Sequence, residues 1–263
     1  MNKQLLLCGV LAILFLSCSG SKEAGTDGEL KGPPKPITSV FKMLSINLAH
    51  GLQDKSDVKK FSDWVKTTGA EVVAVQQIER ATESKPGFDA YEELLKKLDM
   101  RGTFAKARYF KGWDSGNALF CMYPMMQSNV YALPVGKGKV RRSLSFAVFE
   151  LGLKSVAFAS TDLDDEDLSE RLKQVREIFS IQKSMEEYPI VVAGNFGESV
   201  KGKASATMME KYSSTNAITD QLSSAEQHVF VPLEKKMNVI AAEKVVYKPL
   251  NQTGVLVTVE VVQ

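Results

Sequence analysis

The chain has 263 residues, of which 44% are hydrophobic and 24% charged, a composition typical of a folded globular protein and not of a disordered or fibrous one. Its 33 Lys and Arg against 31 Asp and Glu leave a formal net charge of +2, so no strong overall field is available to attract nucleic acid or an anionic membrane. The two histidines, His50 and His228, exclude a histidine-rich metal site, and the three cysteines, Cys8, Cys18 and Cys121, exclude a disulfide framework.

Residues 1–17 have the pattern of a secretory signal peptide. A short polar start is followed by an apolar run from Leu5 to Leu16, which is shorter than the roughly 20 residues that a transmembrane helix needs. Ser17 directly before Cys18 resembles the lipobox of bacterial lipoproteins, in which the cysteine sulfur carries a diacylglycerol and becomes the new N-terminus. The alternative is an ordinary signal peptide with a coincidental cysteine. We expect a lipid at Cys18 that anchors the mature chain to a membrane.

Residues 18–37 begin with this cysteine and are otherwise rich in Gly, Ser, Lys, Glu and Pro, with little that could be buried. This composition predicts a flexible tether between the anchor and a globular body. The sequence shows no internal repeat and no second linker, so residues 38–263 are expected to form one domain.

Beyond the tether, strand-like apolar runs alternate with segments of helical periodicity. Strands are expected at residues 40–47, 71–77, 116–123, 130–134, 143–151, 155–160, 190–193, 229–231 and 255–262. Helices are expected at residues 57–68, around 91–98 and at 168–185, where apolar side chains recur at helical spacing. This order of elements predicts a mixed α/β domain.

Five segments in chain order resemble motifs of the endonuclease/exonuclease/phosphatase superfamily, the deoxyribonuclease I-like proteins. Residues 44–51 (LSINLAHG) resemble its first strand and N-x-x-x-G turn, and residues 71–77 (EVVAVQQ) resemble its D-V-V-A-L-Q-E strand. Residues 116–124 (GNALFCMYP) are similar to G-N-A-I-L-S-R-Y-P, residues 160–164 (STDLD) to T-H-L-D, and residues 191–197 (VVAGNFG) fall where the family has G-D-F-N. The resemblance implies a four-layer α-β-β-α sandwich of two packed mixed β-sheets flanked by helices.

Proteins of that superfamily hold a divalent cation, usually Mg²⁺, and activate a water that attacks a phosphate ester. By the resemblance, the asparagine that helps to hold the metal is Asn47, whereas the metal-binding glutamate falls on Gln77, an uncharged carboxamide. The histidine of T-H-L-D, a hydrogen-bond donor next to the scissile phosphate, falls on Asp162, and the aspartate of G-D-F-N, which would orient the water, falls on Asn195. The metal site and the catalytic site are therefore both expected to be degenerate.

The superfamily's S-D-H motif, which precedes the last strand, falls on residues 252–254 (QTG) and leaves Gly254 where a histidine would be. Changes such as Glu to Gln and Asp to Asn keep the shape of a side chain and remove its charge, so the strands can still pack. Losing acid–base catalysis alone costs about 10²- to 10⁴-fold in rate. We therefore expect the scaffold to persist with little or no hydrolytic activity, and we interpret His50 and His228 as ordinary, partly exposed histidines.

Four further residues are candidates for ligand contacts in the same cleft. His50 follows the turn at Asn47, and Glu79 lies two residues after Gln77 on the same face of the expected strand, from which it could reach a metal. Trp113 and Asn117 lie at the start of the third motif, where an exposed tryptophan could stack on a sugar or a base.

Two charged runs have simpler interpretations. The acidic run at residues 162–167 lacks the spacing of a calcium loop and is interpreted as a solvated helix start. The basic run at residues 137–142 is interpreted as the charged tip of a hairpin loop, with an anion-contacting loop over the cleft as the alternative.

The favoured hypothesis is a lipid-anchored protein of the bacterial cell envelope, periplasmic or at the cell surface, that no longer catalyses hydrolysis. It would bind a small-molecule or protein ligand, would require no cofactor, and is not expected to bind nucleic acid. The alternative is a divergent phosphodiesterase or phosphatase that uses Mg²⁺, and a third possibility is a structural role in an envelope complex.

Overall fold

The computed structural model of the chain describes residues 39–262 except 85, 153 and 236. The predicted signal peptide, Cys18 and the tether lie outside the described residues. In the described part, no helix is both long and apolar enough to cross a membrane.

The first six-stranded sheet joins both ends of the domain, with the strand order β11-β12-β1-β2-β4-β3. Its strands are β1 (Ser39–Asn47), β2 (Val72–Arg80), β3 (Arg101–Phe110), β4 (Trp113–Cys121), β11 (Met237–Tyr247) and β12 (Gln252–Val261). Only β1 and β2 pair in parallel here, and helix α1 (Lys55–Thr68) forms the crossover that a parallel pair needs. Helix α2 (Ala90–Leu98) connects β2 to β3.

The second six-stranded sheet has the order β5-β6-β7-β8-β10-β9. Its strands are β5 (Met125–Ala132), β6 (Ser143–Leu151), β7 (Lys154–Asp162), β8 (Ile190–Asn195), β9 (Tyr212–Ser214) and β10 (Gln227–Pro232). The parallel pair β7 and β8 is joined by α3 (Leu168–Ser184), and the short helix α4 (Lys203–Met208) follows β8. Three single-turn 3₁₀ helices complete the described chain: η1 (Thr215–Ala217), η2 (Asp220–Leu222) and η3 (Lys248–Leu250).

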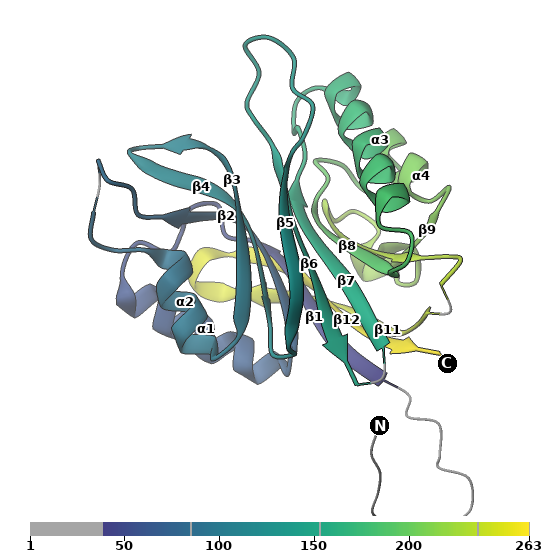
Figure 1. Cartoon of the computed structure of the whole chain (residues 1–263), viewed down its shortest axis with the longest axis horizontal. Helices are drawn as coiled ribbons and strands as arrows, with labels where there is room; N and C mark the ends of the chain where they lie inside the picture. Colours follow the sequence, from purple (N-terminus) through teal and green to yellow (C-terminus); the bar gives the residue numbers. More distant parts are fainter. Residues whose placement is uncertain (1–38, 85, 153, 236, 263) are drawn as a thin grey trace, which may run out of the picture. The chain divides into compact units, whose positions relative to one another are not determined.

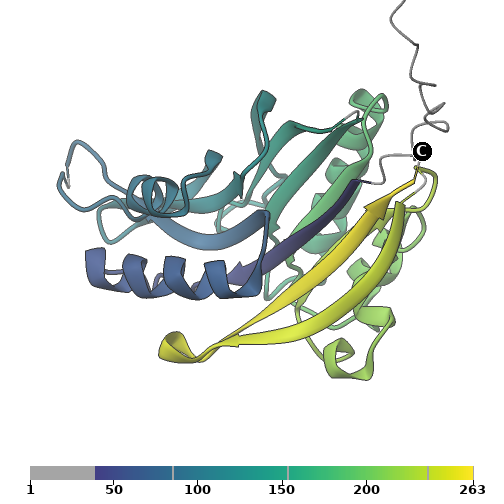
Figure 2. The same ribbon diagram turned by 90° about the horizontal axis from the view of Figure 1, so that it is seen from below.

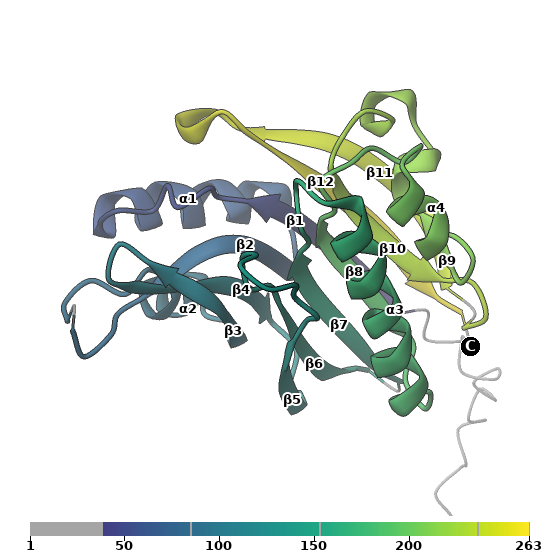
Figure 3. The same cartoon turned by 90° about the horizontal axis from the view of Figure 1, so that it is seen from above.

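The two sheets face each other, and the helices cover their outer faces (Figures 1 and 3). Alternate residues of β2 explain this layering: Val72 and Ala74 belong to the apolar cluster between the sheets, whereas Val73 and Val75 belong to the cluster beneath α1 and α2. A third cluster lies between the second sheet and its helices α3 and α4. Strands that are buried on both faces read as continuous apolar runs, which is why the sequence predicted them. The expected four-layer α-β-β-α sandwich is therefore present.

The long hairpin of β11 and β12 extends along one side of the first sheet, and η3 forms its tip (Figure 2). β12 pairs with β1 over almost its whole length, from Gly254 opposite Ile46 to Val261 opposite Ser39. This pairing places the start of β12 beside the end of β1, where the site residues of β1 lie.

The acidic run at residues 162–167 begins helix α3, as expected, but it is not solvated throughout. Asp167 is the N-cap residue of the helix, and its side chain accepts a hydrogen bond from Ser169 N. Asp164 accepts hydrogen bonds from two backbone N–H groups of the same turn, and both Asp162 and Asp164 are buried. The expectation of a solvated run is therefore wrong for these two carboxylates, each of which has specific partners.

Candidate active site

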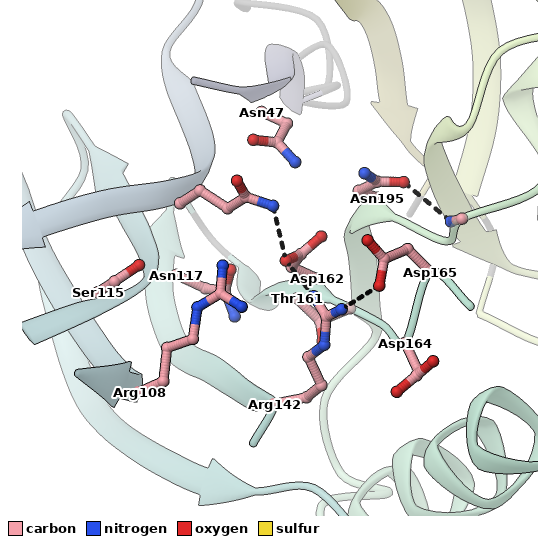
Figure 4. A network of polar contacts seen from close by, with 12 residues as sticks. Asn47, Arg108, Ser115, Asn117, Arg142, Thr161, Asp162, Asp164, Asp165 and Asn195 are labelled. Atoms are coloured by element: carbon pink, nitrogen blue, oxygen red, sulfur yellow. Dashed lines mark hydrogen bonds and ion pairs between the residues drawn. The ribbon is translucent and has the colours of Figure 1, made fainter. Parts of the chain in front are cut away.

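The carboxyl ends of the two parallel strand pairs meet at one edge of the sandwich. Parallel strands place their carboxyl ends on the same side of a sheet, so β1 and β2 present Asn47 and Gln77 where β7 and β8 present Asp162 and Asn195. Asp162 and Asn195 are directly opposite each other in the pairing of β7 with β8. Gln77 Nε2 donates to Asp162 Oδ2 over 3.2 Å and links the two sheets. Four residues that the motifs singled out separately are therefore neighbours. Asn47, Asp162 and Asn195 are labelled in Figure 4.

A β-bulge in β2 turns Gln77 toward this edge. The pairing with β4 shifts between Gln76 and Ile78, and Gln77 itself has a left-handed backbone with φ of 53°. Gln76 points between the sheets and donates to Ser160 Oγ over 3.0 Å. The bulge interrupts the regular alternation from which we expected Glu79 to share the face of Gln77. A residue other than glycine keeps a left-handed backbone conformation only where the surrounding structure holds it there.

A buried ion pair lies at Asp162, at the carboxyl end of β7. Arg142 Nη1 donates to Asp162 Oδ2 over 2.5 Å, and Arg142 Nη2 donates to Asp165 Oδ1 over 2.6 Å. The side chains of Arg142 and Asp162 are only 5% and 9% exposed. Burial raises the pKa of Asp162, and the guanidinium of Arg142 opposes that shift. The centre of the site is thus filled by a cationic side chain of the chain itself.

Arg142 is the site residue that the sequence interpretation missed. The basic run at residues 137–142 was expected to be a charged loop tip, and this is wrong for Arg142, which is 5% exposed and reaches the carboxyl end of β7. The signal that could have found it is indirect. A carboxylate at the end of a buried strand, such as Asp162, needs a cationic or hydrogen-bonding partner.

The donor set at this point suits a divalent cation poorly. Asn47 Oδ1 already accepts a hydrogen bond from Ala49 N (2.8 Å), and Asn195 Oδ1 accepts one from Gly197 N (2.9 Å). Gln77 is uncharged, and Arg142 already neutralises Asp162. Among the residues that the structure describes, no group of three or more His, Cys, Asp or Glu side chains is arranged to hold a metal. Mg²⁺ favours carboxylate oxygens in octahedral geometry, which these residues do not supply.

A cleft of about 460 Å³ lies beside the ion pair. Most of its walls are carboxamides, namely Asn47, Gln77, Asn195, Gln221, Gln227, Asn251 and Gln252. Ser224 and Thr253 add hydroxyl groups, and the lining also contains one cation and one anion, Lys244 and Glu226. Gly254 directly follows Thr253, which lines the cleft. A Cβ at Gly254 would lie 2.9 Å from Ser45 O, so this position has no room for a larger side chain.

His50 and Glu79 form a separate group next to the cleft. His50 Nδ1 lies 2.6 Å from Glu79 Oε1, and the imidazole stacks on Phe110 with ring centroids 3.8 Å apart. Arg108 Nη2 lies 3.4 Å from the other ring nitrogen of His50. Glu79 and Trp113 line a small cavity of about 10 Å³ that is distinct from the cleft.

Asn117 is buried and connects the two sheets. Its Nδ2 donates to Ser143 O over 2.8 Å, and the residue is 1% exposed. It lines a second cavity of about 10 Å³ together with Gln77, Arg142 and Asp162. The structure thus places Asn117 behind the ion pair, whereas the sequence suggested a cleft contact.

His228 is not partly exposed, as the sequence interpretation assumed, because β10 is an inner strand of the second sheet. The residue is 0% exposed and packs edge-on against Phe196, with ring centroids 5.5 Å apart. Its Nε2 lies 2.8 Å from Glu198 O. Burial lowers the pKa of His228 to about 4, so the ring is neutral at pH 7.

Comparison with known proteins gives matches at the level of structure. No protein-family profile and no curated protein sequence matches this chain. An endonuclease/exonuclease/phosphatase from Beutenbergia cavernae DSM 12333 superposes with a TM-score of 0.68 at 14% identity, covering 85% of this chain and 72% of the other. An endonuclease/exonuclease/phosphatase from Bacteroides vulgatus has a TM-score of 0.67 at 15% identity, covering 85% and 99%.

The human Nocturnin catalytic domain, solved with a bound sulfate anion, is also similar, with a TM-score of 0.67 at 14% identity, covering 87% of this chain and 98% of that domain. Identities of this size establish the architecture and leave the chemistry open. The chain therefore has the fold of the endonuclease/exonuclease/phosphatase proteins.

Proposed function

We propose that this protein binds a ligand in the cleft and does not hydrolyse phosphate esters there. The observation that carries the proposal is the bond between Arg142 and Asp162, whose Nη1 and Oδ2 atoms are 2.5 Å apart. By the resemblance, Asp162 takes the place of the histidine of T-H-L-D. A guanidinium stays protonated at every pH at which the protein is folded, so Arg142 cannot act as a general base. Asp162 Oδ2 already accepts hydrogen bonds from both Gln77 and Arg142.

Two carboxamides remove the remaining parts of the family reaction. Gln77 stands where a glutamate would hold the metal, and Asn195 stands where an aspartate would orient the water. Each lacks both negative charge and basicity. Loss of the general base costs about 10²- to 10⁴-fold, and loss of the metal removes the activated nucleophile as well. The open cleft of about 460 Å³ leaves room for a bound molecule.

The test is steady-state hydrolysis of bis(p-nitrophenyl) phosphate and p-nitrophenyl phosphate by the purified full protein, with Mg²⁺ or Mn²⁺ added. We expect a rate equal to that of the metal-containing buffer, for the wild type and for Asp162→Asn alike. Metal-dependent turnover that is lost in Asp162→Asn would contradict the proposal.

The alternative, a divergent Mg²⁺-dependent phosphodiesterase or phosphatase, has one observation in its favour. His50 and Glu79 form a histidine–carboxylate pair with a 2.6 Å contact, an arrangement that can transfer protons. The variant Glu79→Gln distinguishes a hydrolase from a ligand-binding protein. A hydrolase that uses this pair would lose its turnover in the variant. Our proposal predicts no turnover in the wild type or in the variant.

We further propose that Cys18 carries a lipid and holds the body at a bacterial envelope membrane. The support is the apolar run before Ser17-Cys18 and the polar tether after it. In a bacterial host fed labelled palmitate, we expect the full chain to be labelled and to sediment with membranes. Cys18→Ser should lose both properties, whereas Cys8→Ser, a matched change inside the leader, should keep them. Label and sedimentation that survive in Cys18→Ser would contradict the anchor.

A further inference from the structure

We propose that the ligand of the cleft is an uncharged, hydroxyl-rich molecule of the saccharide class. The inference rests on the proposed function, because it names what the same cleft holds. It comes from the hydrogen-bond donors and acceptors that neighbouring contacts fix at the floor of the cleft.

Two amide nitrogens are fixed donors. Asn47 Oδ1 accepts from Ala49 N over 2.8 Å, and Asn195 Oδ1 accepts from Gly197 N over 2.9 Å. Each oxygen is thereby held by the turn that follows its own strand, which defines the orientation of the amide. Neither Nδ2 atom has a hydrogen-bond partner among the described residues. In Figure 4 the two side chains point toward a common space, so the floor offers two NH₂ groups to a ligand.

One oxygen of the lining, that of Gln77, is a fixed acceptor, and the Asp162 carboxylate lies next to it outside the lining. Gln77 Nε2 donates to Asp162 Oδ2, which leaves Gln77 Oε1 without a donor in the part of the chain that the structure describes. Asp162 Oδ2 takes the bonds from both Gln77 and Arg142. The second oxygen of Asp162 is on the side of the carboxylate that faces Asn47 and Asn195 (Figure 4). Donors and acceptors therefore alternate around one space.

A hydroxyl group matches this alternation, because it accepts one hydrogen bond and donates another. Adjacent hydroxyls of a sugar can accept from Asn47 or Asn195 and donate to Gln77 Oε1. A phosphate dianion has no proton to donate, so it would set its oxygens against Gln77 Oε1, with the negative charge of Asp162 close by. Leaving such acceptors unpaired on binding costs about 1–3 kcal/mol each. The floor of the cleft therefore favours a polyol over a phosphate.

The walls of the cleft agree with a neutral polar ligand. Carboxamides and hydroxyls make up most of the lining, and the one cation, Lys244, is balanced by the one anion, Glu226. The volume of about 460 Å³ lies within the range of small-molecule sites. A short saccharide fits both the size and the chemistry.

The test compares matched pairs of probes with the full protein: mannose with mannose 6-phosphate, and glucose with glucose 6-phosphate, by saturation-transfer NMR and titration calorimetry without added metal. We expect the neutral member of at least one pair to bind about tenfold more tightly than its phosphate. Asn195→Asp keeps the shape of the side chain but replaces the free donor with an acceptor, so it should weaken sugar binding about tenfold. Asn129→Asp, on the exposed edge strand β5, adds the same charge and should bind as the wild type does.

Tighter binding of the phosphorylated member, no detectable binding of either neutral sugar at about 10 mM, or unchanged binding by Asn195→Asp would each overturn the saccharide proposal. These results would leave the absence of hydrolysis intact. Release of inorganic phosphate from either sugar phosphate once Mg²⁺ is added would instead overturn the proposed function itself.

Discussion

At the scale of single residues, the buried pair Arg142–Asp162 is the observation on which the proposed function rests. Two charges that are each less than a tenth exposed are tolerated because they neutralise each other and because Gln77 and Asp165 supply further hydrogen bonds. Removing one partner leaves the other charged in a poorly solvated place. We predict that Arg142→Met lowers the free energy of unfolding by about 3–5 kcal/mol, measured by urea titration.

Two matched variants distinguish the loss of the ion pair from other causes of a lower unfolding free energy. Arg141→Met removes an exposed charge from the neighbouring position and should change stability by no more than about 0.5 kcal/mol. The double variant Arg142→Met/Asp162→Asn removes both charges and should recover most of the loss. A double variant that is as unstable as Arg142→Met would show that the packing of Arg142, and not its charge, is what matters.

His228 makes the unfolding free energy of the protein depend on pH. Its folded-state pKa of about 4 lies below the usual value of 6.5, so the unfolded chain takes up the proton first. The stability from this residue is complete above pH 6.5 and is lost as the pH falls toward 4. We predict that between pH 7 and pH 4 the wild type loses about 3 kcal/mol more unfolding free energy than His228→Phe. The carboxylates common to both proteins cancel in this difference, and parallel pH profiles would contradict the prediction.

The sequence predicted the site residues that follow buried strands, but it did not predict Arg142, which lies in a loop. Asn47, Gln77 and Asn195 lie at the ends of buried strands, where a motif fixes both position and environment, and the structure brings them together with Asp162. Arg142 lies in a segment whose local composition is that of an exposed loop. Its burial depends on Asp162 across the sheet, a tertiary contact that no local pattern encodes.

At the scale of elements, the inner strands were predictable, and the edge strands β3, β9 and β11 were not. Strands such as β2 and β8 are apolar on both faces and stand out as continuous runs. β3 (Arg101–Phe110) and β11 (Met237–Tyr247) lie at the edges of the first sheet and carry exposed or charged side chains at many positions. Such strands have no continuous apolar run, and their pairing partners decide their conformation. The fold was therefore recognised from its motifs and its interior, and not from its edges.

The pairing of β7 with β8 depends on Gly194, directly before the site residue Asn195. A Cβ at this position would lie 1.9 Å from Thr161 O, a backbone atom that cannot move aside without separating the strands. We predict that Gly194→Ala lowers the unfolding free energy by about 3 kcal/mol, measured by urea titration. Gly138→Ala is the control: that glycine has φ of 76°, but a Cβ added there would meet no atom within 4 Å, so only about 1 kcal/mol should be lost. Equal losses in the two variants would contradict a role for close strand contact.

At the scale of the whole domain, the apolar core between the sheets and the candidate site are made of different residues. The apolar cluster between the sheets draws on residues from both sheets, such as Phe41, Leu119, Phe158 and Val229, and none of the residues that meet at the ion pair belongs to it. Exchange of charged side chains for carboxamides at the strand ends therefore leaves the core intact. The architecture is therefore compatible with the proposed loss of the groups that phosphate-ester hydrolysis needs.

The central claim is that no divalent cation is held between Asn47 and Gln77 in a way that supports hydrolysis. The most direct measurement is a crystal structure of the protein soaked with Mg²⁺ and phosphate, paired with calorimetric titration of Mg²⁺ in solution. We predict that Arg142 stays bonded to Asp162, that only water lies between Asn47 and Gln77, and that the titration gives no saturable heat. An ordered Mg²⁺ beside Gln77 with phosphate bound to it, together with rapid cleavage of a phosphate ester by the same preparation, would contradict the claim.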